Sequence, residues 1–450
     1  MKRWWVLVVV ILVALAVWVS LPDREPVGFV LISIDTLRAD HLGAYGYPLD
    51  TSPFFDAFAA RGTLFENAKV QLPGTLPSHM SIFTGLYPAE HGVYPPSRRT
   101  STSASVLSRE IPTLPELFQR AGYRTAAFSE GGYVAGVYGF SRGFDVYDDA
   151  VKAKPGGAAE TVRRALEFVE GLRRDEKFFI FLHTYEVHDP YMAPEGYASW
   201  TGPVPGDWEP TGFNLEAASM GKLELSERQL EYFISLYDAS IRFVDDQLRR
   251  FAEALWEKDF EGDVWVVITS DHGEEFMEHQ KLAHGQVYDE NLHVPLLIRR
   301  LGQRRGSRVS SLVESVDIAP TLLELAGIET AGIAMSGRSL VPALSDDGFE
   351  VRTLAYAESP NPPARTIYQQ REDGLYQFLL RGEAPRLRRE LFNLSEDPHA
   401  VRNLADQRRI LLRELESKLE LYDVEARAEA GKTDLTEEQA ERLRALGYLQ

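Results

Sequence analysis

Residues 28–35 read Gly-Phe-Val-Leu-Ile-Ser-Ile-Asp, an apolar run that stops at an aspartate. The run is continuous rather than alternating, which is typical of a strand buried on both faces of a sheet. Similar apolar runs recur further along the chain, at Phe178–Leu182, Val264–Ile268 and Val294–Ile298. We interpret all four runs as buried strands.

Helical patterns separate these strands. They lie at Ser52–Arg61, Glu160–Leu172, Arg228–Leu255 and Asp317–Leu325. Strands that alternate with helices predict a mostly parallel central sheet with helices on both faces. We therefore expect an α/β domain over residues 26–345.

After Phe349 the predicted strands become short. Short strand patterns lie at 353–358, 374–380 and 391–393, and a charged helical pattern follows at 406–425. This order predicts a small α+β subdomain over residues 346–425, packed on the main domain.

Residues 426–450 are expected to form a helical tail. Thr436 and Gln439 have the spacing of a capping box at the start of a helix, and Gly447 is placed to end it. The sequence indicates no role for this tail.

An unbroken apolar run, Trp4–Val19, follows Lys2 and Arg3 at the N-terminus. Extended by Ser20 and Leu21, this run nearly matches the hydrocarbon core of a bilayer, so residues 1–22 are expected to form an uncleaved transmembrane signal anchor. A cleaved signal peptide and a buried helix are the alternatives. Because the positive charges stay inside, the catalytic domain is expected to face the periplasm or the extracellular side.

Composition narrows the class of function. The 450 residues carry 48 Lys and Arg against 67 Asp and Glu, a net charge of −19, so no nucleic-acid partner is expected. The chain has no cysteine. This excludes disulfides, zinc–thiolate sites and cysteine nucleophiles, and leaves His, Asp, Glu, Ser and Thr to carry the chemistry.

Three of the predicted strands end in clusters of side chains that can bind a metal. The clusters are Ser33–Asp35, His183–His188 and Ser270–His272. In open α/β sheets, ligands bind outside the carboxyl ends of the strands, so we expect the three clusters to face one crevice. The alternative is that Asp35 caps a loop and that Asp271 and His272 lie in a solvated turn.

A fourth motif, Thr75–Gly85, reads as a short helix. Pro77 suits the first turn of a helix, and Gly85 suits its C-terminal cap. The free N–H groups and the dipole at such a helix start favour an oxyanion beside Thr75. The simpler reading is that Thr75 only caps the helix.

These motifs together carry a family resemblance. The segments concerned are Ser33–Gly43, Thr75–Gly85, Ser270–Gly273, His284–Pro295, Val316–Leu322, Gly337–Leu340 and Glu390–Leu394. The chain resembles, from about Gly28 onwards, the sulfatase branch of the alkaline phosphatase superfamily. The resemblance implies the alkaline phosphatase-like fold of that family.

The resemblance also implies roles for particular residues. Asp35, Asp271 and His272 match metal ligands, and Thr75 matches the nucleophile, which also contacts the metal. His79 stands where the sulfatase motif has an arginine. His188 matches a histidine that contacts the ester, and His284 matches a position that is lysine in many sulfatases. These three histidines are expected to take part in catalysis.

The site differs from that of a typical sulfatase in its metal and in its nucleophile. The imidazole of His272 in the ligand set favours zinc or manganese, with calcium as the alternative. A second metal, held by His188, Glu186 and His284, is also compatible with the sequence. Formylglycine forms from Cys or Ser, so none is expected at Thr75.

Threonine at position 75 resembles the phosphodiesterase and phosphoethanolamine transferase branches of the superfamily. We therefore expect a membrane-anchored, metal-dependent hydrolase that cleaves phosphate esters or phosphodiesters through Thr75. The alternatives are a sulfatase, a phosphoryl transferase to a surface acceptor, and a binding protein without turnover. The substrate is expected to be a small-molecule, lipid or glycan ester, and the sequence does not indicate the oligomeric state.

Overall fold

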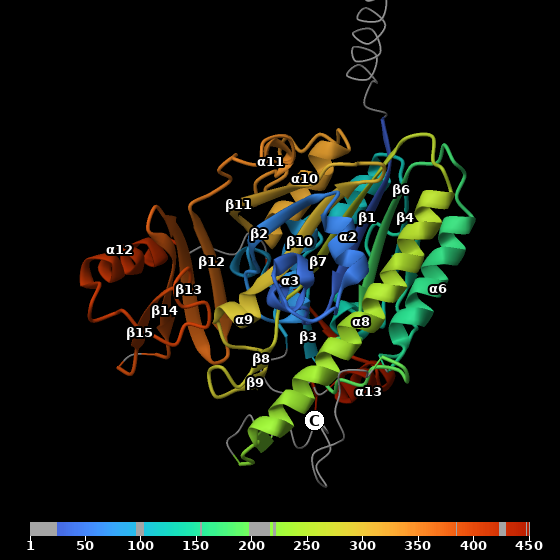
Figure 1. Ribbon diagram of the computed structural model, residues 1–450. Coiled ribbons are helices and arrows are strands. Elements are labelled where there is room, and N and C mark those ends of the chain that lie inside the picture. Colours follow the sequence, from blue (N-terminus) through green and yellow to red (C-terminus); the bar gives the residue numbers. More distant parts are fainter. Residues whose placement is uncertain are drawn as a thin grey trace, which may run out of the picture.

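The computed structural model describes residues 25–95, 103–153, 155–197, 217–218, 222–383, 385–422, 429–446 and 448–449. Its centre is an eight-stranded sheet with the order β11-β2-β10-β7-β1-β6-β4-β5 (Figure 1). The strands are β1 (Pro26–Ile34), β2 (Thr63–Lys69), β4 (Arg124–Phe128), β5 (Val146–Asp148), β6 (Phe178–Thr184), β7 (Asp263–Ser270), β10 (His293–Arg300) and β11 (Ser307–Glu314).

The central sheet is mostly parallel, as the sequence predicts. β1 pairs in parallel with both β6 and β7, and β4 pairs in parallel with β5 and β6. β10 is the exception, because it runs antiparallel to both of its neighbours, β2 and β7. The strand at 294–298 is thus confirmed, but its direction breaks the parallel pattern.

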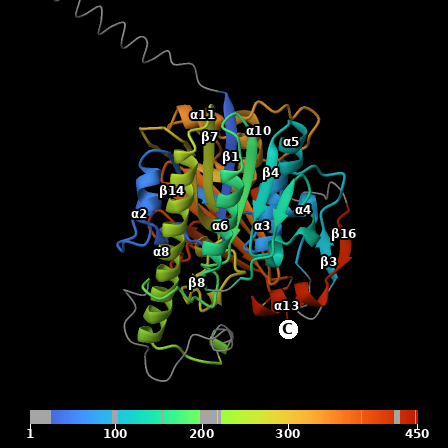
Figure 2. The ribbon, with the colours of Figure 1, turned by 90° about the vertical axis from the view of Figure 1, so that its right-hand side faces the viewer.

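Helices cover both faces of the central sheet (Figures 1 and 2). One face carries α2 (Pro53–Ala59), α6 (Gly157–Glu170) and α8 (Glu227–Glu257), and the other carries α3 (Thr75–Thr84), α5 (Leu114–Arg120) and α10 (Ile318–Leu325). Successive side chains of β1 alternate between the two resulting cores, with Leu31 in one and Val30 in the other. This explains why the strand is apolar without a break.

The predicted α+β subdomain is present as an antiparallel sheet, β12-β13-β14-β15, with one helix packed on it. Its elements are β12 (Leu354–Pro360), β13 (Pro363–Arg371), β14 (Gly374–Arg381), β15 (Arg388–Asn393) and α12 (Arg409–Glu420). Strand β13 is not among the predicted strands. The subdomain contacts the main domain through Arg352, which forms buried ion pairs with Glu314 and Asp317.

The C-terminal tail packs on the main domain. β16 (Gly431–Asp434) pairs with β3 (Ser103–Val106), and α13 (Glu437–Ala445) follows. The predicted capping box is present, since Thr436 Oγ1 accepts from the backbone N–H of Gln439 while the Gln439 side chain accepts from Thr436. Gly447, the predicted end of this helix, lies outside the described residues.

The remaining elements are short. They are α4 (Pro88–His91), α9 (Asp289–Leu292), α11 (Val341–Ser345), β8 (Glu275–Phe276), β9 (Leu282–Ala283) and the 3₁₀ turns at 39–41, 43–45, 132–134, 136–138 and 315–317. Within the described part of the chain, no helix has both the length and the apolar character that crossing a bilayer requires. The predicted anchor at residues 1–22 lies outside this part.

Candidate functional site

The carboxyl ends of β1 and β7 bring the predicted metal ligands together. These strands are neighbours in parallel register, with Ile34 beside Ser270, so Asp35 and Asp271 leave the sheet side by side. One ligand atom from each of Asp35, Asp271 and His272 lies within 4.8 Å of the other two. All three residues are fully buried.

The turn after β1 is held in an unusual conformation. Thr36 has a φ of 55°, in the left-handed region that a β-branched residue rarely adopts. Three hydrogen bonds hold it: Thr36 N donates to Asp271 Oδ1 at 3.3 Å, Thr36 Oγ1 donates to Val187 O at 2.9 Å, and Tyr237 donates to Thr36 O at 2.8 Å. Backbone strain of this kind costs about 1–3 kcal/mol and is common at functional sites. Here it accompanies the placement of the Asp35 carboxylate.

Thr75 begins α3, and its hydroxyl faces the two strand ends. Thr75 Oγ1 donates to Asp35 Oδ2 at 3.2 Å and lies 3.4 Å from His272 Nε2. Gly85 ends the helix with a φ of 68°, as its predicted role as a cap requires. Pro77 lies in the first turn, where a missing N–H costs no hydrogen bond within the helix. The predicted helix and its position are confirmed.

His272 has the orientation of a metal-binding histidine. Its Nδ1 donates to the carbonyl of Gly273 at 2.9 Å, which leaves Nε2 directed at Thr75. A hydrogen bond at one ring nitrogen fixes the tautomer and the ring orientation needed for ligation through the other.

The buried carboxylates fit a divalent cation. Among the described residues, neither Asp35 Oδ1 nor Asp271 Oδ2 has a hydrogen-bond partner. Burial and the neighbouring charge of Asp271 raise the pKa of Asp35 well above its usual range. A cation between the two side chains would offset both effects, and two carboxylates, an imidazole and a hydroxyl form a suitable oxygen and nitrogen ligand set.

His79 lies beneath Thr75 with both ring nitrogens engaged. Nδ1 donates to Thr75 O at 2.8 Å, and Nε2 accepts from Ser33 Oγ at 2.9 Å. Burial lowers the pKa of His79 to about 3, so the ring is neutral. His79, His183 and Asp271 also form a compact group, but these two hydrogen bonds occupy the His79 nitrogens. The geometry favours His79 as the residue that positions the start of α3.

His183 lies on β6 beside Ser33 of β1, and its Nε2 is 3.5 Å from Asp35 Oδ2. Burial lowers the pKa of this imidazole to about 4. A neutral, buried ring next to the Asp35 carboxylate fits a packing or supporting role for His183.

His188 and His284 lie on the outer side of the ligand cluster. His188 Nδ1 donates to Asp189 O at 2.7 Å. Burial lowers the pKa of His188, but Asp189 and Asp35 outweigh it and raise the pKa to about 9. The His284 ring centroid is 4.3 Å from that of His272 and 5.4 Å from that of His188. His284 Nδ1 lies 3.3 Å from Glu274 Oε1, which orients the ring.

Two glutamates near β6 have supporting contacts. Glu186, a ligand in the alternative with a second metal, accepts from the backbone N–H groups of Gly156 and Ala158 at the start of α6. Glu130, for which sequence reasoning found no role, accepts from Thr184 Oγ1 and Tyr185 N. Burial raises the pKa of Glu130 to about 8. Both carboxylates hold the segment that carries His188.

The residue that sequence reasoning missed is Tyr448. Its hydroxyl lies 3.0 Å from Thr75 Oγ1 and 2.9 Å from His188 Nε2. No pattern in the sequence connects the tail to the site, so only the tertiary structure reveals this contact.

A pocket of about 190 Å³ opens beside His188. Its walls come from Tyr185, Glu186, Asp189 and Met192, and from Ala445 and Leu446 of the tail. This position makes the pocket a candidate for the part of the substrate beyond the reacting ester.

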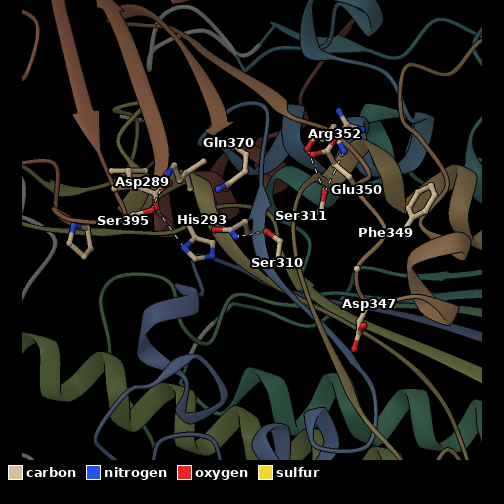
Figure 3. Close-up of a pocket in the computed structure, with 15 residues that line it drawn as sticks. Asp289, His293, Ser310, Ser311, Asp347, Phe349, Glu350, Arg352, Gln370 and Ser395 are labelled. Carbon is tan, nitrogen blue, oxygen red and sulfur yellow. Dashed lines mark hydrogen bonds and ion pairs between the residues drawn. The ribbon is translucent and has the colours of Figure 1, made fainter. Parts of the chain in front are cut away.

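A separate cavity of about 480 Å³ lies where the second sheet meets the central sheet (Figure 3). Figure 3 shows Asp289 and His293 on one side and Glu350 and Arg352 on the other. Ser311 Oγ accepts from the backbone N–H of Val351 at 2.9 Å across this junction. None of the residues around Thr75 lines this cavity.

Comparisons with known proteins give matches to two family models. A family model described as "Sulfatase" matches residues 28–328, and one described as "N-sulphoglucosamine sulphohydrolase, C-terminal" matches residues 277–426. Arylsulfatase K of Xenopus laevis is 24% identical over 420 residues, which covers 82% of this chain and 77% of that protein.

Two solved structures share the fold. BT4656, in complex with its substrate D-glucosamine-2-N,6-O-disulfate, aligns with a TM-score of 0.71 and 21% identity, covering 89% of this chain and 97% of the other. Phosphonate monoester hydrolase of Agrobacterium radiobacter aligns with a TM-score of 0.66 and 21% identity, covering 88% and 94%.

Proposed function

Since this chain belongs to the sulfatase family, we propose that it is a metal-dependent hydrolase of phosphate esters or phosphodiesters with Thr75 as its nucleophile. The observation that carries the proposal is the position of Thr75 Oγ1. It is buried at the start of α3, 3.2 Å from Asp35 Oδ2 and 3.4 Å from His272 Nε2. An activated hydroxyl needs this kind of contact with basic groups.

The chemistry of threonine favours phosphorus over sulfur. A formylglycine hydrate has a second hydroxyl that lets a sulfated intermediate collapse by elimination. Thr75 lacks this hydroxyl, and oxidation of its Cβ gives a ketone rather than an aldehyde. A phosphorylated threonine, in contrast, is hydrolysed when water attacks the phosphorus.

Asp35, Asp271, His272 and Thr75 Oγ1 are the residues that would hold the metal, with zinc or manganese favoured. A bound divalent cation supplies Lewis acidity, which lowers the pKa of a coordinated hydroxyl and neutralises developing charge.

The chain's own residues account for the proton transfers. Thr75 donates its proton towards Asp35 Oδ2, and Oγ1 attacks phosphorus in line. The bond between phosphorus and the leaving oxygen then breaks, and His188 Nε2 protonates that oxygen. His188 suits this role because its raised pKa keeps it protonated near neutral pH. Water then gives a proton to His188 and attacks the phosphorus of the phosphothreonine, the bond from phosphorus to Thr75 Oγ1 breaks, and Oγ1 takes its proton back from Asp35. The product is phosphate from a monoester or a phosphate monoester from a diester.

Other residues stabilise charge or hold the nucleophile. The N–H groups at the start of α3 and the His284 ring are the groups that would stabilise the charge gained by the non-bridging oxygens. His79, through its bond to Thr75 O, keeps the nucleophile at the helix start.

Cleavage of sulfate esters is the second candidate function. It is supported by the names of relatives such as arylsulfatase K, although identity to that protein is only 24%. Transfer of the phosphoryl group to an acceptor other than water would use the same first step. A small-molecule, lipid or glycan ester is the proposed substrate class, and the disulfated glucosamine bound by BT4656 is in keeping with a glycan.

We also propose that residues 1–22 anchor the chain, with its catalytic domain outside the cytoplasm. The support is the apolar run after Lys2 and Arg3. Membrane fractionation of full-length chain, compared with chain lacking these residues, tests this. Recovery of the full-length chain in the soluble fraction contradicts it.

The proposed function is tested by turnover of aryl phosphate, aryl phosphodiester and aryl sulfate by the purified chain. We expect EDTA to reduce phosphoester cleavage by at least about 100-fold, because a metal and its ligands dominate the stabilisation of charge. Added zinc or manganese should restore it. Turnover of aryl sulfate alone, or phosphoester turnover that EDTA does not affect, would contradict the proposal.

A further inference from the structure

The C-terminal tail brings a phenol hydroxyl to the centre of the site. Tyr448 lies 373 residues after Thr75 in the sequence, yet its hydroxyl is 3.0 Å from Thr75 Oγ1. The same hydroxyl is 2.9 Å from His188 Nε2. Figure 2 shows α13 at the bottom of the view, below the strands of the central sheet.

The C-terminal tail packs against the main domain. Tyr448 N donates to Leu443 O at 2.9 Å, and Leu446 and Leu449 are only 8% and 6% exposed. Leu446 packs over Gly132, where a Cβ would lie 2.8 Å from Leu446 Cδ1. These contacts make Tyr448 a regular part of the site rather than a loose chain end.

Packing also orients the ring of Tyr448. Its centroid is 4.4 Å from that of Tyr133 and 5.3 Å from that of His188. Arg442 of α13, six residues earlier, donates from Nη1 to Asp149 O and ties the helix to the loop after β5. Neighbours on several sides therefore limit the directions that the phenol can take.

The surrounding hydrogen bonds indicate the direction in which Tyr448 donates. His188 Nδ1 faces a carbonyl and must be a donor, and Thr75 Oγ1 donates to Asp35. One arrangement places a proton in every contact: His188 Nε2 donates to the Tyr448 oxygen, and the Tyr448 hydroxyl donates to Thr75 Oγ1. The tyrosine then links the proposed acid to the proposed nucleophile.

We propose that Tyr448 is a catalytic residue: its hydroxyl orients Thr75 Oγ1 in the free site and, once substrate is bound, donates its one proton to a non-bridging oxygen of the transferred group. The inference rests on the proposed function of Thr75 and His188. A group that Thr75 Oγ1 attacks and whose leaving oxygen His188 Nε2 protonates must lie between these two atoms. The Tyr448 hydroxyl contacts both atoms, so the group lies within its reach. A fixed donor at such a place lowers the barrier because it needs no reorganisation.

The test is Tyr448→Phe in the full, metal-loaded chain. We expect kcat to fall by about 10- to 1000-fold, the usual effect of removing one such donor, with KM changed by less than about threefold. The metal-induced rise in melting temperature should stay the same. Tyr138→Phe is the matched control, because the Tyr138 ring also packs on Tyr133, and it should leave kcat unchanged.

Binding of orthovanadate gives a readout that needs no turnover. We expect Tyr448→Phe to weaken the affinity of the metal-loaded chain for vanadate by at least about 10-fold, since the hydroxyl would contact its oxygens. If the wild-type chain cleaves no phosphoester, the proposed function fails, and vanadate binding still decides the role of Tyr448.

Two results would overturn the role of Tyr448. The first is a Tyr448→Phe variant whose kcat and vanadate affinity both equal those of the wild type. The second is a rise in turnover, in Tyr448→Phe or in a chain that ends at residue 447, which would mean that the tail obstructs the site.

Discussion

Thr75→Ala is expected to reduce phosphoester turnover by at least about 10⁴-fold, because the variant has no oxygen with which to attack phosphorus. The residual rate would come from the metal ligands and from the start of α3, which remain in place. The measurement is kcat with aryl phosphate at saturating metal, since Thr75 Oγ1 is itself a proposed ligand. A stopped reaction in which wild-type chain, but not the variant, carries labelled phosphate on threonine would identify the intermediate.

Two variants control for damage to the helix. Thr84→Ala removes a buried threonine from the same helix, where Oγ1 donates to Met80 O far along α3 from the site, and should leave turnover near that of the wild type. Thr75→Ser keeps the nucleophilic oxygen and should retain measurable turnover. If Thr75→Ala keeps more than about a tenth of the wild-type kcat, Thr75 is not the nucleophile.

Asp271→Ala is expected to abolish metal binding and to reduce turnover by at least about 10³-fold. Loss of a residue that only supports a metal ligand commonly costs 10- to 100-fold, so loss of a charged ligand should cost more. In the wild type, metal at about 100 times its Kd should add about 2.7 kcal/mol to the free energy of unfolding. The variant should show no such gain when its melting temperature is measured with and without zinc.

The melting temperature of the metal-free chain gives a second readout for Asp271→Ala. Asp271 accepts from the backbone N–H groups of Thr36 and His272, and nearby histidines hold its pKa well below its usual range, so its loss leaves buried donors without an acceptor even though it relieves the repulsion with Asp35. The metal-free variant should therefore melt below the metal-free wild type, and added zinc should not raise its melting temperature. Asp238→Asn changes another buried carboxylate paired with a histidine, His41, and should lower stability while keeping the response to metal. A metal response in Asp271→Ala would contradict the ligand assignment.

Local sequence patterns predicted several strands of the central sheet but not the direction of every strand. Continuous apolar runs predicted β1, β6 and β7 because both faces of these strands are buried. The direction of β10 could not be read in this way, since an antiparallel strand buried on both faces has the same apolar pattern. Strand β13 carries polar residues such as Thr366 and Gln369, so it lacked the apolar run that marks the other strands.

The same distinction holds within the site. That Asp35, Asp271 and His272 converge was predictable, because parallel neighbouring strands end at one edge and each residue directly follows its strand. The hydrogen bonds at both ring nitrogens of His79 could not be predicted, because Ser33, the partner of Nε2, lies on another element. The contacts of Glu186 could not be predicted either: free N–H groups at the start of α6 bind its carboxylate, and a second metal there was only an alternative reading of the sequence.

The sequence alone determined the α/β class, the helix that begins at Thr75 and the set of groups at the strand ends, because each depends on residues that are close in the chain or on the shared edge of a parallel sheet. Only the tertiary structure decided that Tyr448 completes the site. Its position depends on the packing of Leu446 and Leu449 into a core built from residues hundreds of positions earlier, and no local pattern encodes a contact of that kind.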